Sequence, residues 1–277
     1  METKIIVDSC YDFNDSMLDP DIEYTRVPFS ILIDDNEIID ENINTTWLID
    51  KMQMTKNRIG TACPPPEAFF KAIDPEKNNY IVTISSKLSG SYNSAMAAKQ
   101  LAEEKGFGDR VFVFDSLSAA CGENLVGIKI AEMLHKGLTP EEIVPIIRDF
   151  IHGMTTFFIL NSMDNLVKNG RIKPGVALVG KLLKISPIMM GVNGEIELKE
   201  KVRGKKKSFK RLAQIVADEV DSSKDRIFAI THVNARETAE ALKSQLEELT
   251  DFKKIVIFES GGLSTVYADR GGIVVAY

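Results

Sequence analysis

The sequence predicts an α/β protein in two parts, the first built on a parallel sheet and the second on a mixed sheet. Three observations predict this fold: short β-branched runs alternate with longer runs of helical periodicity, several strand-like runs end in small polar residues, and a hairpin signal lies in the second half. Strand, polar turn and helix in repetition is typical of parallel strands joined by crossover helices. A chain of 277 residues is long enough for two domains of ordinary size.

In the first half, we expect three buried strands, at residues 4–7, 80–84 and 111–114. Apolar residues at helical spacing predict helices at residues 93–105, 122–136 and 139–152. Ligands of parallel sheets bind beyond the carboxyl ends of the strands. We therefore expect one edge of this sheet to collect the polar turns that follow the strands, which are Asp8-Ser9, Ser85 to Ser91 and Asp115-Ser116.

The second half begins after the helix that ends at His152. Asn193-Gly194 is a hairpin signal between strands expected at residues 185–191 and 195–199. The other expected strands are at residues 155–160, 227–231, 254–259 and 272–277. The expected helices are at residues 164–168, 176–183, 208–220 and 238–248. We place the boundary near residue 152, which gives an N-terminal domain of residues 1–152 and a C-terminal domain of residues 153–277.

Composition and charge exclude several classes of protein. The formal net charge of −6 argues against nucleic acid as the main partner. No apolar run approaches the roughly 18 to 20 residues needed to span a bilayer, and the first residues do not resemble a signal peptide, so we expect a cytoplasmic location. Three widely spaced cysteines fit a reducing compartment. Three scattered histidines, with no Cys-x-x-Cys pair, argue against a metal site.

Two short motifs point to enzymes, and in each case a structural interpretation is favoured. Residues 175–182 nearly spell a phosphate-binding P-loop, but Leu182 stands where Ser or Thr must ligate magnesium, so an amphipathic helix fits better. Cys63 precedes three prolines, and a following helix N-terminus would activate its thiol. Because no base is evident nearby, a small residue in a tight turn is the better interpretation of Cys63.

The turn from Ser85 to Ser91 packs hydroxyl groups and a glycine between a buried strand and a helix. Free amides at a helix N-terminus bind a carboxylate or a phosphate, whereas Ser89 or Ser91 would serve equally well as an ordinary helix cap. The basic residues between Lys199 and Arg211 also have two interpretations, a solvated surface or a site for an anionic ligand or acidic partner. Cations at the start of the expected helix oppose its dipole, which adds weight to the second.

A series of short motifs runs in order along nearly the whole chain. Asp8-Ser9, Val27-Pro28-Phe29, Gly60 to Pro65 and Ser85 to Tyr92 lie in the first half. Asp164 to Arg171, Gly180 to Ile188 and Lys201-Val202-Arg203 lie in the second. Each motif is weak alone, but their joint order and spacing resembles the DegV family of bacterial fatty-acid-binding proteins.

The resemblance implies a two-domain α/β fold with a ligand cleft between the domains, in which one long acyl chain is buried. The family's carboxylate ligands, carried over, fall on Thr61 and Ser89, with the amide of Gly90 beside them. The resemblance also implies a binding protein and not an enzyme by itself, because a separate fatty acid kinase would phosphorylate the presented carboxylate with ATP. Arg171, Lys201 and Arg203 would then face the phosphate or the kinase.

The ligand implied is thus a long-chain fatty acid, with no cofactor and at most transient contact with a membrane. Apolar residues are candidates for the wall of an acyl tunnel, with ordinary core packing as the alternative for each; they are Phe158, Leu182, Met189 and Met190. Met189 and Met190 are the preferred pair, because methionine adapts to a flexible tail.

The sequence departs from the family pattern at three places. Ala62 stands where the family has Ser, and Asn169 where it has Gly. Tyr267 takes the place of a histidine that completes the carboxylate network, and a tyrosine hydroxyl carries no positive charge near neutral pH. Two alternatives therefore stay open: a phosphotransferase or other enzyme that uses the turn from Ser85 to Ser91 as an anion site, or a relative whose lipid site has decayed.

Overall fold

The computed structural model describes residues 2–12, 21–177 and 185–277. Its first part is a parallel four-stranded sheet of order β2-β1-β6-β7, and its second part is a six-stranded mixed sheet of order β10-β9-β8-β13-β11-β12. A three-stranded antiparallel sheet of order β4-β3-β5 lies beside them. The α/β class and the mixture of parallel and mixed sheets predicted from the sequence are confirmed.

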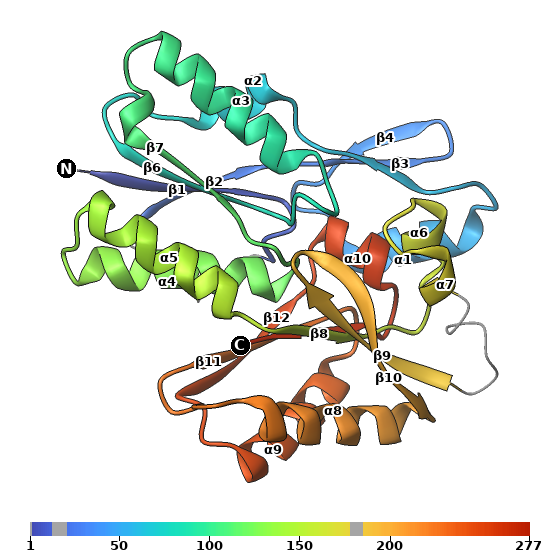
Figure 1. Cartoon of the computed structure of the whole chain (residues 1–277). Coiled ribbons are helices and arrows are strands. Elements are labelled where there is room, and N and C mark those ends of the chain that lie inside the picture. Colours follow the sequence, from blue (N-terminus) through green and yellow to red (C-terminus); the bar gives the residue numbers. More distant parts are fainter. Residues whose placement is uncertain (1, 13–20, 178–184) are drawn as a thin grey trace.

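Every strand of the first sheet runs parallel to its neighbours. The strands are β1 (Thr3–Asp8), β2 (Glu23–Val27), β6 (Asn78–Thr83) and β7 (Val111–Asp115). The helices of this part are α2 (Pro66–Ala72), α3 (Ser91–Glu104), α4 (Cys121–His135) and α5 (Pro140–Gly153), with a short 3₁₀ turn η2 (Gly108–Arg110). As Figure 1 shows, α2 and α3 cover one face of the sheet, and α4 and α5 cover the other.

Helix α5 illustrates why these segments are helical. Thr139 and Glu142 form a capping box, in which the Glu142 carboxylate accepts a hydrogen bond of 2.8 Å from the Thr139 amide. Ile143, Ile147 and Ile151 recur at every fourth position and are all buried against the sheet. The helix therefore has a local start signal and one apolar face.

The second sheet has six strands, of which β9 and β10 form the predicted hairpin. The strands are β8 (Thr156–Ile159), β9 (Ile185–Val192), β10 (Glu195–Arg203), β11 (Ile227–His232), β12 (Lys254–Glu259) and β13 (Ile273–Ala276). The helices are α6 (Asp164–Lys168), α7 (Pro174–Ala177), α8 (Lys205–Glu219), α9 (Arg236–Leu249) and α10 (Gly262–Ala268). At the hairpin turn, Asn193 and Gly194 both have positive φ angles, of 50° and 82°, as a two-residue turn of this kind requires.

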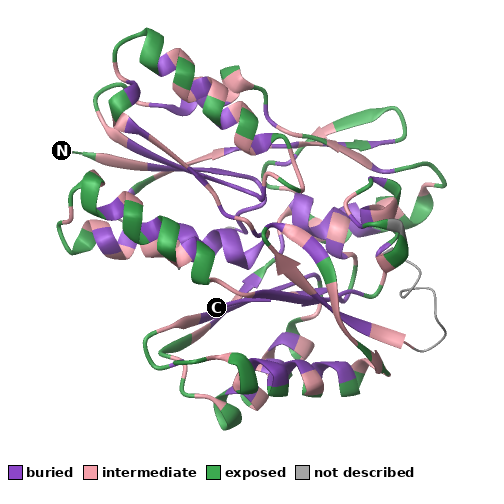
Figure 2. Ribbon diagram, in the orientation of Figure 1, coloured by how far each residue is buried: buried purple, intermediate pink, exposed green. Residues whose placement is uncertain are grey.

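Helix α4 joins the two parts, because it packs against both large sheets. Its Val126 and Ile130 lie in the core of the parallel sheet, while Cys121 and Leu125 pack against β11, β12 and β13 of the mixed sheet. Figure 2 shows the resulting pattern, in which the strands are mostly buried and the exposed residues lie on the outer faces of the helices and in the loops. Helix α4 therefore contributes to the cores of both parts.

Several elements differ from the sequence prediction. The three-stranded sheet was not expected; it consists of β3 (Ser30–Ile33), β4 (Asn36–Ile39) and β5 (Gly60–Ala62), with α1 (Thr45–Met54) next to it. β10 continues to Arg203, and α8 already begins at Lys205, so the basic residues divide between a strand and a helix. The helix expected at residues 176–183 falls mostly outside the described residues.

The boundary predicted near residue 152 lies at the end of α5, and the division into domains 1–152 and 153–277 stays a prediction. Across residues 2–12, 21–177 and 185–277, we find no helix that has both the length and the apolar character for crossing a membrane.

Candidate functional site

A cavity of about 360 Å³ lies between the two parts of the fold. Its wall is mostly apolar, and its volume is in the range of small-molecule sites. The first part contributes the loops that follow β1, β6 and β7, and the second contributes β8, β13, the β9–β10 turn and α10. The cavity thus lies at the carboxyl ends of the parallel strands, where ligands of such sheets bind.

Successive side chains of β8 alternate between the cavity wall and the core. Thr156, Phe158 and Leu160 line the cavity, whereas Phe157 and Ile159 point into the core under α8 and α9. Val274 of β13 pairs with Phe158 and extends the apolar surface.

Four residues proposed from the sequence as carboxylate ligands all line this cavity: Thr61, Ser89, Gly90 and Tyr267. Thr61 on β5 and Tyr267 on α10 are 206 residues apart, yet their hydroxyl oxygens lie 2.7 Å from each other. Two hydroxyl groups carry two protons, and their mutual hydrogen bond uses one. The pair therefore retains one O–H that can donate to a ligand oxygen.

Ser89 and Gly90 lie just before α3. The Ser89 hydroxyl accepts a hydrogen bond of 3.2 Å from the Ser91 amide, so its own proton is available to another acceptor. A Cβ atom on Gly90 would lie 3.1 Å from the sulfur of Cys63, which also lines the cavity. A side chain at position 90 would therefore crowd this end of the cavity.

Asp8 fixes the loops that carry these groups. Its carboxylate accepts hydrogen bonds from the Cys10 amide at 2.9 Å, the Ile84 amide at 3.0 Å and the Ser91 hydroxyl at 2.6 Å. The predicted meeting of the polar turns after the first two strands is thus confirmed. Asp8 is fully buried, and this burial raises its pKa to about 6, against the opposing effect of its hydrogen bonds.

Arg171 is the one cationic side chain among the described residues that line the cavity. Its guanidinium donates a hydrogen bond of 2.9 Å to the Leu88 carbonyl and a further one to the Asn169 carbonyl. Asn169, the departure from the family pattern, donates from its amide to the Ile59 carbonyl at 2.9 Å. These bonds to backbone oxygens hold the position of the arginine at the edge of the cavity.

The structure does not bring the other proposed residues into the described cavity wall. Lys201 and Arg203 are exposed on β10, and they lie on the edge strand of the mixed sheet. Met189 is buried in a cluster with Phe158, and Met190 packs against the core under α8 and α9. Leu182 lies outside the described residues.

Helix α10, which carries Tyr267, was not predicted from the sequence, and residues from the first part of the fold hold its start. Asp40 accepts hydrogen bonds from the amides of Gly262 at 3.1 Å and Leu263 at 2.8 Å, and Arg26 lies 3.8 Å from its carboxylate. A Cβ atom on Gly262 would lie 2.2 Å from an Asp40 oxygen, so only glycine fits there. Burial raises the pKa of Asp40, and the charge of Arg26 opposes this rise.

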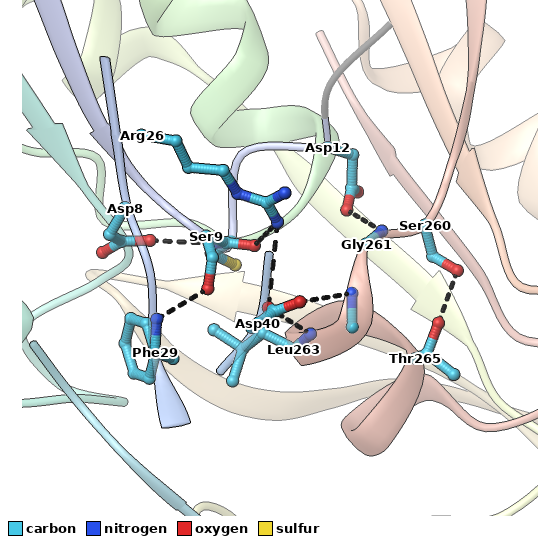
Figure 3. A network of polar contacts seen from close by, with 12 residues as sticks. Asp8, Ser9, Asp12, Arg26, Phe29, Asp40, Ser260, Gly261, Leu263 and Thr265 are labelled. Carbon is cyan, nitrogen blue, oxygen red and sulfur yellow. Dashed lines mark hydrogen bonds and ion pairs between the residues drawn. The ribbon is translucent and has the colours of Figure 1, made fainter. Parts of the chain in front are cut away.

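Asp12 makes a second anchor for the same helix (Figure 3). Its carboxylate accepts hydrogen bonds from the Gly261 amide at 2.8 Å and from the Thr231 hydroxyl at 2.7 Å. Burial raises the pKa of Asp12 to about 6. Figure 3 shows that both aspartates come from the first part of the fold and reach the start of α10. Nothing close to Gly262 in the sequence signals this cap, because Asp40 is 222 residues away.

No group of three or more histidine, cysteine, aspartate or glutamate side chains in the described part of the chain could hold a metal ion. The described cavity wall offers hydrogen bonding by hydroxyl groups and amides, the charged side chains of Arg171 and Glu195, and a large apolar surface.

Comparisons with known proteins agree with this geometry. The model of the DegV family matches residues 2–277. A DegV domain-containing protein of Streptococcus gordonii is 32% identical over 283 residues, covering 100% of this chain and 99% of the relative. Among solved structures, a DegV family protein from Ruminococcus gnavus, refined with vaccenic acid, has a TM-score of 0.92 and 37% identity, with 100% and 99% of the two chains covered.

A further similar structure is the Fatty Acid Kinase (Fak) B3 protein of Streptococcus pneumoniae, loaded with linoleic acid. Its TM-score is 0.91 and its identity is 30%, over 100% of this chain and 99% of that one. The fold and the family expected from the sequence motifs are both confirmed: the chain belongs to the DegV family.

Proposed function

We propose that this protein binds a long-chain fatty acid in the cavity and presents its carboxylate to a separate kinase. The observation that carries the proposal is an apolar cavity between the two parts of the fold, with hydroxyl groups of Thr61, Ser89 and Tyr267 in its wall. Fatty acids in two similar structures support the choice of ligand, and the name of the pneumococcal protein supports a kinase partner. A phosphotransferase acting on a small polar substrate would need a more polar cleft.

The energetics divide between tail and head group. Each buried methylene contributes about 0.8 kcal/mol, so a tail of ~14 methylenes supplies on the order of 11 kcal/mol. Association itself takes back roughly 4 to 15 kcal/mol. A buried carboxylate without partners would cost several kcal/mol more, and the hydroxyl groups with the Gly90 amide offset that cost. The tail therefore supplies affinity, and the polar groups set the orientation.

Tyr267 in place of the family's histidine gives this site a neutral donor. Because the tyrosine hydroxyl is already bonded to Thr61, the pair presents one shared donor and no charge. Arg171 supplies the positive charge at the cavity wall. We propose that it faces the carboxylate or the phosphate formed there.

Protein purified from bacteria is expected to carry a fatty acid, and Ser89→Ala is expected to weaken its retention. The variant leaves the buried carboxylate with one donor fewer, which costs about 1 to 3 kcal/mol. Titration with a fluorescent fatty acid measures the change. Ser86→Ala is the matched control, because Ser86 lies in the same turn but not among the described cavity residues. Equal affinity for Ser89→Ala and wild type would contradict the assignment, and organic extracts free of acyl lipid would contradict the function.

The exposed basic pair on β10 is proposed as the contact with the kinase. Reversing both charges, with Lys201→Glu and Arg203→Glu, should lower acyl phosphate formation with the kinase roughly tenfold and leave lipid binding intact, because rim charges act mainly on association. Lys253→Glu with Lys254→Glu is the control, since these lysines are also exposed but lie at the other edge of the same sheet. Normal turnover of the Lys201 and Arg203 variant in a reconstituted assay would rule out this contact.

A further inference from the structure

Two more hydroxyl groups meet inside the apolar cavity, in addition to those proposed for the carboxylate. The oxygens of Ser118 and Thr156 lie 2.7 Å apart, and both residues line the cavity. They are nearly sequestered from solvent, with exposures of 5% and 8%. Thr156 lies on the face of β8 that lines the cavity, followed on that side by Phe158 and, just beyond the strand, by Leu160. An apolar side chain at this position would complete the wall. The Thr156 hydroxyl is therefore a polar group in an otherwise apolar surface, and it needs a hydrogen-bond partner.

The position of the pair is fixed from both sides. Ser118 lies in the loop between β7 and α4, and Thr156 lies on β8, so their hydrogen bond joins the two parts of the fold. A Cβ atom on Gly122 would lie 2.0 Å from the Ser118 hydroxyl oxygen, so the first turn of α4 holds that side chain closely. The Ser118 hydroxyl therefore has little freedom to turn elsewhere, and its hydrogen bond of 2.7 Å holds the hydroxyl of Thr156 beside it.

Counting protons shows that the pair is incomplete. Its two hydroxyl groups carry two protons, and the bond between them uses only one. Ser264 of α10 adds a third hydroxyl to the same cavity wall, but it faces the buried carboxylate of Asp12, which accepts its hydrogen bond. Buried hydroxyls are nearly always hydrogen-bonded, and an unpaired one carries a full desolvation cost. A plain alkyl tail in this cavity offers no atom that could pair with them.

We infer that the cavity prefers a fatty acid whose alkyl chain carries a hydroxyl group, held by the Ser118–Thr156 pair. This inference rests on the proposed function, since it names the class of fatty acid for the same cavity. A hydroxyl group is both donor and acceptor. On the ligand, it can accept a hydrogen bond from the free O–H of the pair and donate one to a lone pair of the same two oxygens. The carboxylate keeps its separate donors on Thr61, Ser89 and Tyr267.

The test compares octadecanoic acid with a panel of octadecanoic acids hydroxylated at single positions along the chain, by displacement of a fluorescent fatty acid from the delipidated protein. We expect at least one hydroxylated acid to bind about tenfold more tightly than octadecanoic acid. A panel in which no hydroxylated acid exceeds octadecanoic acid would overturn the inference. It would mean that solvent, and not the ligand, completes the hydroxyl pair.

Variants identify the groups responsible. The double variant Ser118→Ala with Thr156→Val keeps the volume of the wall and should bring the ratio of the two dissociation constants to about one. Thr83→Val is the matched control: Thr83 is also fully buried, its hydroxyl has no partner among the described residues, and it lies outside the described cavity wall. In Thr83→Val, the ratio of the dissociation constants of octadecanoic acid and the preferred hydroxylated acid should equal that of the wild type.

Persistence of the preference in the double variant would overturn the assignment to Ser118 and Thr156. Failure of every acid to bind, octadecanoic acid included, would overturn the proposed function and this inference with it. Binding of octadecanoic acid without any preference would overturn the inference alone.

Discussion

Asp40→Ala is expected to destabilise the protein by about 1 to 3 kcal/mol, because it leaves two amides of α10 without their acceptor and the partly buried charge of Arg26 without this carboxylate. Asp40 has 1% of its side chain exposed, and it caps the start of α10 through the amides of Gly262 and Leu263. The same helix presents Tyr267 to the cavity. The substitution should therefore lower the midpoint of denaturant unfolding and also weaken fatty-acid binding.

Asp40→Asn distinguishes the contribution of the ion pair with Arg26 from that of the hydrogen bonds to the start of α10. Asparagine keeps one oxygen that can accept from the α10 amides but carries no charge, so we expect a loss of stability well below that of Asp40→Ala. Urea unfolding, followed by tryptophan fluorescence and circular dichroism together, measures both variants. An alanine variant as stable as wild type would mean that neither the cap nor the ion pair holds α10.

The stability of the protein is expected to fall as the pH rises from about 4 to about 6.5. Asp8 and Asp12 have folded-state pKa values of about 6, raised from 3.8 by burial. The folded state therefore holds these protons over a range where the unfolded chain has released them, and stability declines as pH increases through that range. A rise in pKa from 3.8 to about 6 corresponds to about 3 kcal/mol per group.

Asp12→Asn tests this pH dependence, since an amide cannot titrate. Its free energy of unfolding should decline less steeply between pH 4 and 6.5 than that of wild type, whatever its absolute value. Buried Glu123 contributes in the same direction in both proteins, because burial raises its pKa well above the usual range; in wild type the charge of Asp12 raises it further, which adds to the difference between the two slopes. Identical slopes for Asp12→Asn and wild type would show that Asp12 does not titrate in this range.

The sequence predicted the elements whose signals are local. α5 carries its own capping box and an isoleucine at every fourth position, and the β9–β10 turn carries Asn-Gly. The polar ends of β1 and β6 predicted that their turns would meet, and the carboxylate of Asp8 joins them. Motif order placed Thr61, Ser89, Gly90 and Tyr267, all of which line one cavity.

Other elements were missed because distant residues determine them. α10 has only seven residues, rich in small and polar types, and its start depends on Asp12 and Asp40 from the other part of the fold. The β3–β4 hairpin is an exception with a local signal, since the apolar pairs Leu32-Ile33 and Ile38-Ile39 flank a polar turn in which Asp34 adopts a positive φ of 54°. Spacing alone could not predict that Ser118 and Thr156 meet, because each lies in a segment with an ordinary structural role.

The central place of β13 has a consequence for biosynthesis. β13 pairs with β8 on one side and β11 on the other, although it follows every other strand of this sheet in the sequence. While the ribosome has yet to release residues 273–276, each of these two partners has an edge with unpaired amides and carbonyls. Pairings between distant segments form slowly, and open edges attract other chains. The second half can therefore complete its sheet only once residues 273–276 have left the ribosome, and until that strand is inserted the open edges of β8 and β11 can pair with other chains.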